Sequence, residues 1–275
     1  MEILKMTFMQ NALLAALLAS IACGIIGSLV VINRLVFLSG GIAHTAYGGV
    51  GLAFFLGLPV LPCTLGITML ASLIMAGITV RNMENADTVI GVLWASGMAL
   101  GIILLDISPG YNVDLMSYLF GSILTVPRFD IWIMLALIVS VLALTLIFYH
   151  DFLLMSFDPD FARTRGVAVT PLYFLLLTMI AVSVVMLIQV VGLILVIALL
   201  SIPPYLARGK SRSLAWMMLK ACIYSLVFCL LGLYLSYRFN ITSGACIIAV
   251  ASAGFFTKVS ANLLIPKKTV KNSEI

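Results

Sequence analysis

The sequence predicts an all-α polytopic membrane protein, and three observations indicate this class. Of the 275 residues, 63% are hydrophobic and only 9% are charged, whereas roughly 25% of an average soluble domain is charged. The apolar runs are continuous and reach the length of about 20 residues that a membrane-spanning helix needs. They lack the segments of about ten residues with alternating hydrophobicity that are typical of a membrane β-barrel.

Nine apolar runs predict about nine spans in a single transmembrane domain that covers residues 1–275. The runs are residues 10–32, 41–58, 61–80, 88–105, 130–149, 170–188, 190–206, 216–237 and 243–263. The first run lacks the basic segment and the clear cleavage site of a signal peptide, so we expect it to remain as a span. Only Gln189 and its neighbours separate the sixth and seventh runs. These two runs form either a tight hairpin or a partly re-entrant pair, so the number of spans is eight or nine.

The distribution of Lys and Arg predicts how the chain crosses the membrane. With the N-terminus outside, 12 basic residues fall inside, whereas three, Lys5, Arg128 and Arg238, fall outside. Cytoplasmic loops carry the excess of Lys and Arg in membrane proteins. We therefore expect an external N-terminus, a cytoplasmic tail at residues 264–275 and an odd number of spans.

The longer outer connection, residues 106–130, contains a turn signal at Pro109-Gly110 and an amphipathic piece at residues 115–124. Such a piece either caps the ends of the neighbouring helices or lies along the membrane interface.

The inner connection, residues 150–170, predicts a short cytoplasmic helix. Asp158 is a suitable N-cap, Pro159 suits the first helical position, and Gly166 suits the C-terminal cap. The connection also contains three aromatic residues, Phe152, Phe157 and Phe161. A solvated linker rarely needs such side chains, so we interpret the segment as a docking element for a soluble partner.

The stretch from Ser39 to Leu58 holds one of the two histidines of the chain, well inside apolar sequence. On a helix, Gly40, His44 and Gly48 share one face, and Gly41, Thr45 and Gly49 form the neighbouring row. Glycines in such rows allow membrane helices to approach closely. An ionisable group at membrane depth usually marks a transport pathway. The alternative is a packing helix whose histidine bonds a nearby carbonyl.

The sequence lacks the motifs that several other classes of protein would need. Gly209-Lys210-Ser211 resembles the end of a phosphate-binding loop, but Pro204 replaces its first glycine, so we expect energy for uphill transport to come from another chain. The five cysteines show no CxxC spacing, which indicates free thiols rather than a disulfide framework or a zinc site. The net charge is +5, but the sequence has no cluster of basic residues interspersed with aromatic residues. This argues against nucleic-acid binding.

Five stretches in order resemble the integral permease subunit of ABC importers for zinc, manganese or iron. Ser39–His44 and Gly49–Leu52 resemble the family motifs GDALSH and GVALG, and Asp87–Gly91 resembles DTAIG. Ser117–Leu124 resembles SYLFGSIL, and Phe157–Ala162 resembles the docking helix of the family. Gly192–Ala207 resembles GLLLVSALLVIPAATA. Together these stretches extend over most of residues 30 to 260.

The resemblance implies a fold like that of the vitamin B12-type ABC importer permease, with fewer helices. It implies a multi-pass protein in the lipid of a prokaryotic cell membrane that is not itself an enzyme and binds no cofactor. Its partners would be a second permease copy, cytoplasmic ATPase subunits and an extracytoplasmic metal-binding protein. The metal would pass between the two copies near the second span. The residues implied in ATPase coupling are Phe157, Asp158, Pro159, Phe161, Ala162 and Gly166.

The metal-binding residues depart from the family at one position. The family has an aspartate where this chain has Gly40, so His44 lacks its expected partner. Zinc and manganese sites normally have three or more protein ligands. The missing ligands could come from Tyr47, Asp87, the His44 of a second copy, or water.

Other functions remain open at this point. The chain could be a permease for another small cargo, an intramembrane enzyme that uses His44, or a scaffold subunit without a conduction path. An enzyme would need several polar groups that converge at depth, and the sequence offers few beyond His44 and Asp87. A scaffold would tolerate replacement of His44.

Overall fold

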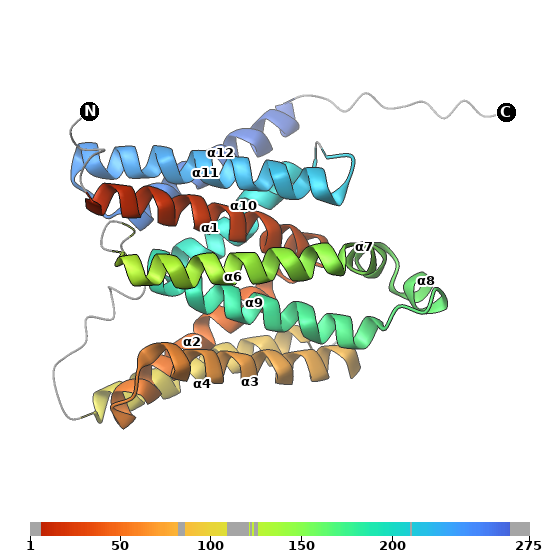
Figure 1. Ribbon diagram of the computed structural model, residues 1–275, viewed down its shortest axis with the longest axis horizontal. Coiled ribbons are helices and arrows are strands. Elements are labelled where there is room, and N and C mark those ends of the chain that lie inside the picture. The colour runs from red at the N-terminus through yellow and green to blue at the C-terminus, as the bar shows by residue number, and fades with distance from the viewer. Residues whose placement is uncertain are drawn as a thin grey trace.

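The computed structural model describes residues 7–81, 86–108, 121, 123, 126–209 and 211–264, and within these the elements are helical (Figure 1). The α-helices are α1 (Thr7–Ile32), α2 (Val36–Leu56), α3 (Val60–Arg81), α4 (Ala86–Asp106), α6 (Arg128–Ile147), α7 (Tyr149–Phe157), α8 (Pro159–Thr164), α9 (Val169–Val191), α10 (Leu193–Arg208), α11 (Leu214–Phe239) and α12 (Ser243–Leu264). The predicted turn at Pro109-Gly110, most of the piece at 115–124 and the tail beyond residue 264 lie outside the described residues.

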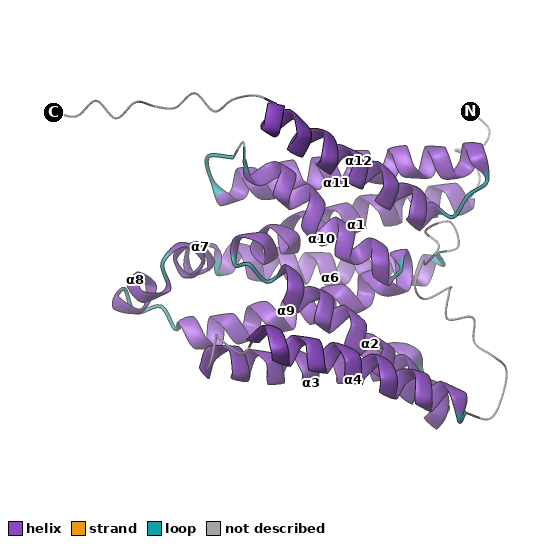
Figure 2. Ribbon diagram, turned by 180° about the vertical axis from the view of Figure 1, so that it is seen from behind, coloured by secondary structure: helices purple, strands orange, loops and turns teal. Residues whose placement is uncertain are grey.

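Each of the nine predicted spans corresponds to a helix, which confirms the predicted fold class. Seven of the described helices are long and apolar enough to cross a membrane. The other two are α2, whose 21 residues include glycines and a histidine, and α10, which has only 16 residues. In both figures of the whole chain, α1 begins at the end of the bundle away from α8, and α12 finishes towards the α8 end (Figures 1 and 2).

The sixth and seventh predicted spans are two helices, α9 and α10, joined by Gly192 alone. Gly192 has φ 83° and ψ 159°, a conformation that is essentially restricted to glycine. Val169 at the start of α9 and Arg208 at the end of α10 each line a cavity together with Asn33 and Arg34. The two helices therefore run in opposite directions and return to the same end of the bundle, as in the tight-hairpin alternative.

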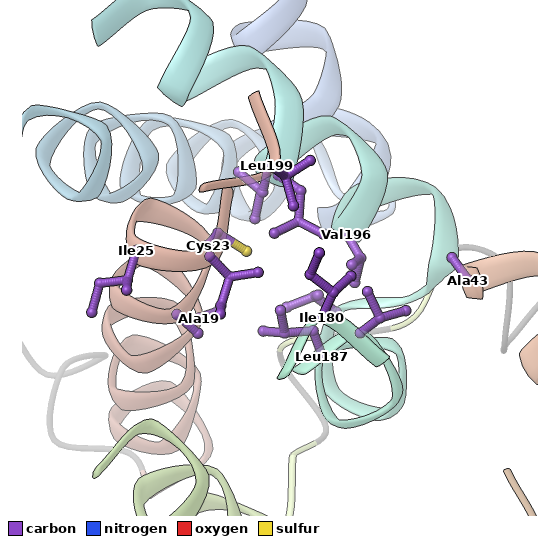
Figure 3. Close-up of a cluster of buried hydrophobic side chains, with 14 of the residues drawn as sticks. Ala19, Cys23, Ile25, Ala43, Ile180, Leu187, Val196 and Leu199 are labelled. Atoms are coloured by element: carbon purple, nitrogen blue, oxygen red, sulfur yellow. The ribbon is translucent and has the colours of Figure 1, made fainter. Parts of the chain in front are cut away.

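The core surrounds α1, of which 78% of the most apolar window is buried. Small residues let its neighbours come close: a Cβ added at Gly27 would lie 2.6 Å from the carbonyl oxygen of Leu200 on α10. Figure 3 shows Ala19 and Cys23 of α1 in one apolar cluster with Ile180 of α9 and Val196 of α10.

The connection between α6 and α9 contains two short helices, of which α8 was expected and α7 was not. The Asp158 side chain accepts a hydrogen bond from the backbone N–H of Phe161 at 2.9 Å, so it caps α8 as predicted, with Pro159 at the first helical position. Gly166 follows the C-cap residue, Arg165, with φ 82°. Phe152 lies on α7 and is fully buried, so it belongs to the core and is unavailable for docking.

Candidate functional site

Helices α2 and α4 pack in parallel with one continuous register. The contacts advance together along both helices: Gly41 faces Ile90, His44 stacks on Trp94, Gly48 faces Gly97, and Gly51 faces Gly101. Added Cβ atoms would collide with backbone at several of these positions; at Gly97 the Cβ would lie 2.8 Å from the Cα of Thr45. Small residues on both helices thus bring the two backbones together, as in other membrane helix pairs.

Three of the four glycines predicted to pack around the path make close contacts, and one does not. Gly41 and Gly48 face α4, whereas Gly49 faces Thr64 on α3. A Cβ added at Gly40 would meet no heavy atom within 4 Å. Packing within the described chain therefore does not require glycine at position 40.

The His44 imidazole is held against α4 by an aromatic stack. Its ring lies 4.2 Å from the Trp94 ring, centroid to centroid, with 14° between the planes. The Phe37 ring also lies near the Trp94 ring, 6.0 Å away from centroid to centroid. Trp94 directs its own N–H to the sulfur of Met98 at 3.2 Å, so the indole is fixed and does not donate to His44.

One nitrogen of His44 is buried without a hydrogen-bond partner among the described residues. This atom is Nδ1, and the bond to a nearby carbonyl that a packing histidine would make is not found there. A buried polar atom that lacks a partner is costly and calls for an explanation. A neutral imidazole has one nitrogen with a free lone pair, so a ligand that accepts this lone pair would satisfy the site.

The face of α2 that carries His44 is not fully covered by this chain. Phe37 and Phe55 on this face are 46% and 43% exposed, and His44 between them is half-buried. The spacing of seven and eleven residues places all three side chains on one stripe of the helix. Helix α4, beside this stripe, has only 11% of its apolar window buried. Lipid or another chain covers these surfaces in the membrane.

Tyr47 lies on another side of α2 from His44. It is buried and lines a small cavity with Thr64 of α3 and with Val185 and Gln189 of α9. The side chain of His44 faces α4 instead. The structure therefore does not direct Tyr47 and His44 to one point.

Asp87 is also separated from His44. It is exposed in the first turn of α4 and lines a cavity of about 380 Å³ together with Arg34 and Arg163. Trp94, which marks the level of His44, is seven residues further along α4, roughly 10 Å along the helix axis. Asp87 belongs to the end of the bundle that carries α8.

Within the described ranges, no group of three or more His, Cys, Asp and Glu side chains is arranged to hold a metal ion. Within the same residues, His44 offers one unpartnered buried nitrogen on this face of α2.

The short helix α8 projects beyond the bundle (Figure 1). Phe157 at the end of α7 is 71% exposed, and Phe161 on α8 is 49% exposed. Ala162, also on α8, is fully buried. The Arg165 guanidinium lies over the Phe161 ring at 5.8 Å, and Arg163 pairs with Asp160 at 2.7 Å. The helix thus presents an aromatic surface with mixed charge.

The site contains neighbours that the sequence interpretation missed. Trp94, Gly97 and Gly101 on α4 form the surface against which α2 packs. The signal was present, because Gly97 and Gly101 are spaced as in the small-xxx-small pattern of membrane helix pairs. The stacking partner of His44 had no comparable signal.

The multi-span fold, the close-packed helix pair with a histidine at depth and the projecting aromatic helix define a class of protein, the membrane subunit of a transporter. The chain belongs to the ABC 3 transport family, whose profile matches residues 5–262. It is thus a multi-pass permease of an ABC transporter family, as the motifs indicated.

Individual relatives agree with this assignment. The chain is 48% identical to an uncharacterized membrane protein of Synechocystis sp., over 94% of this chain and 92% of the relative. It is 31% identical to the manganese transport system membrane protein MntC of Halalkalibacterium halodurans, over 92% and 87%. The solved structure of PsaBC from Streptococcus pneumoniae in complex with Fab matches with a TM-score of 0.82 at 32% identity, and covers 92% of this chain and 91% of that chain.

Proposed function

We propose that the chain is the permease subunit of an ATP-driven importer for a divalent metal ion, with manganese as the first candidate and zinc or iron as the others. The observation that carries the proposal is His44, whose buried, unpartnered nitrogen lies on the incompletely covered face of α2. The names of relatives such as MntC support manganese as the cargo.

The path runs between two copies of the chain, each of which contributes its α2 face. Two imidazoles, together with water or backbone oxygens, supply a mixed nitrogen and oxygen ligand set that first-row divalent metals accept. A set with so few protein ligands binds weakly, which suits a site from which the ion has to leave. The absence of a ligand trio within the described part of one chain supports this arrangement.

Reconstitution tests the function. The permease, its cytoplasmic ATPase subunits and the extracytoplasmic metal-binding protein are placed in liposomes, and uptake of manganese, zinc and iron is measured with and without ATP. We expect ATP-dependent uptake of manganese. Uptake of none of the three metals, or uptake that is independent of ATP, would contradict the proposal.

Docking of the ATPase subunit is assigned to α8, with Phe161 as its aromatic anchor. Phe161→Ala is expected to leave the permease folded but to reduce co-purification of the ATPase subunit several-fold or to uncouple ATP hydrolysis from uptake. Phe239→Ala is the matched control, because Phe239 is similarly exposed but lies at the far end of α11. Equal co-purification and equal uptake in both variants would contradict the assignment.

The α8 end of the bundle is assigned to the cytoplasm, with the N-terminus outside and the C-terminus inside. The clustering of Arg34, Arg163, Arg208 and Arg212 around two cavities at this end supports the assignment. In membrane vesicles of known sidedness, we expect Thr164→Cys to react with an impermeant thiol reagent only from the cytoplasmic side. Reaction of Thr164→Cys from the outside would contradict the orientation.

Restoring the carboxylate of the related permeases should strengthen the metal site. Gly40→Asp is expected to tighten metal binding, because positions 40 and 44 share a helix face and a side chain at position 40 meets no heavy atom within 4 Å. Turnover should fall, since a tighter site releases its ion more slowly. The measurement is the thermal unfolding temperature with and without manganese, compared with Gly40→Asn as the uncharged control. A Gly40→Asp variant whose unfolding temperature does not respond to metal would contradict the prediction.

A further inference from the structure

A cavity of about 720 Å³ opens at the α8 end of the bundle, away from His44. It lies between the end of α1, the connection from α7 to α8, and the connection from α10 to α11. Its lining residues are Ile32, Asn33, Arg34, Met155, Ser156, Phe157, Pro159, Arg208, Ser211, Arg212, Ser213, Leu214 and Met217.

Three exposed arginines line this cavity, and none of the described residues that line it carries a carboxylate. Arg34 lies in the connection between α1 and α2, Arg208 ends α10, and Arg212 lies in the connection between α10 and α11. In the described ranges the one ion pair is that of Arg163 with Asp160, so none of the three has a carboxylate partner there. Three like charges around one hollow repel one another, modestly because solvent screens exposed groups, and a bound anion would compensate them. Arginine is well suited to phosphate, because its planar fork binds two oxygens at once.

The start of α11 adds a second favourable group. The Ser213 hydroxyl accepts a hydrogen bond from the backbone N–H of Trp216 at 3.3 Å, and Leu214, the first residue of this 26-residue helix, lines the cavity. The N-terminus of a long helix carries a partial positive charge. This partial charge, like the arginines, favours a bound anion.

The cavity is amphipathic rather than uniformly polar. Ile32, Met155, Leu214 and Met217 provide apolar walls between the polar groups. Trp216 lies within one turn of the cavity and is 57% exposed, and tryptophan is enriched at the level of lipid headgroups. Basic pockets among the ends of spanning helices are suited to anionic headgroups.

We propose that this cavity binds a phosphate group, carried by an anionic phospholipid headgroup or supplied as a free phosphate, between Arg34, Arg208 and Arg212. The site goes beyond the transport function, since the three arginines belong neither to the metal path nor to α8, although Phe157 and Pro159 at the edge of the cavity also belong to the docking segment. A bound phosphate ties the end of α1 to the connection between α10 and α11 by charge-assisted hydrogen bonds.

The test uses the full-length permease, delipidated in mild detergent, with thermal unfolding and native mass spectrometry as the two measurements. The probes are phosphatidylglycerol, phosphatidylcholine and inorganic phosphate. The variant Arg34→Gln/Arg208→Gln/Arg212→Gln removes the charges, and Arg212→Gln alone serves where the triple variant does not fold. The control is Arg238→Gln, which removes an exposed arginine at the opposite end of α11.

Phosphatidylglycerol is expected to raise the unfolding temperature of the wild type and of Arg238→Gln by about 4 °C more than phosphatidylcholine does, and native mass spectrometry should show one retained lipid. The triple variant should lose both effects. An equal rise with inorganic phosphate and no retained lipid would identify free phosphate as the source of the same group.

Two results would overturn the proposal. One is a triple variant that responds to phosphatidylglycerol and phosphate as the wild type does. The other is a wild type that responds no more to phosphatidylglycerol than to phosphatidylcholine and does not respond to inorganic phosphate.

Discussion

Replacing His44 with phenylalanine is expected to abolish metal uptake while the permease remains folded. Phenylalanine keeps an aromatic ring over Trp94, where the imidazole now stacks at 4.2 Å, but it removes both nitrogens. Loss of groups that merely support a metal ligand costs roughly 10–100-fold in affinity or activity, so loss of the ligand itself should cost at least as much. Uptake in the reconstituted transporter and the unfolding temperature of the purified permease are the two measurements.

The choice of phenylalanine separates a ligand from a packing residue. If His44 served only to fill space against α4, His44→Phe would transport normally, whereas His44→Ala would lower stability by removing the stack. The prediction is therefore wrong if His44→Phe retains wild-type uptake. Ser140→Ala on α6 is the control, because its hydroxyl is exposed and bonds only within its own helix.

Replacing Gly101 with alanine is expected to destabilise the α2–α4 pair by about 1–3 kcal/mol, the usual cost of overpacking. An added Cβ would collide with the carbonyl group of Tyr47, and at Gly51, directly opposite, it would collide with the backbone of Gly101. Backbone cannot rotate away as a side chain can, so the helices have to move apart. The intrinsic gain of up to about 1 kcal/mol for alanine over glycine in a helix reduces this loss without reversing its sign.

Gly91→Ala provides the matched control on the same helix. A Cβ at Gly91 would meet no heavy atom within 4 Å, so this variant gains helix propensity without a collision and should be as stable as the wild type or more stable. For a chain of this size the loss at Gly101 corresponds to a fall of roughly 5 °C in the unfolding temperature. Equal unfolding temperatures for the two variants would contradict the close backbone contact between α2 and α4.

The features that the sequence predicted well are those that depend on local chemistry. Each of the nine expected spans is a helix, and their ends lie within a few residues of the expected positions. The Asp158 cap and the glycine with positive φ after α8 are also present. Apolar runs of about 20 residues and capping side chains act within one segment, so the sequence is sufficient to locate them.

The neighbours of each side chain were much harder to predict. The sequence could place Gly40 and Gly41 on a helix, but it could not show that only Gly41 faces α4. It suggested Asp87 and Tyr47 as partners of His44, and the structure directs both of them elsewhere. It grouped Phe152 with Phe161, although the first is fully buried and the second is half exposed.

The class of the protein, the order and approximate bounds of its helices and the family motifs could be read from the sequence alone. Tertiary contacts were needed to show which residue stacks on His44, that one glycine joins two antiparallel helices, and that three arginines from two distant parts of the chain line one cavity. The physical reason is that membrane helices are apolar on nearly every face, so their composition does not encode their rotation. Rotation and register are decided where small residues let particular backbones meet, and this depends on two helices at once.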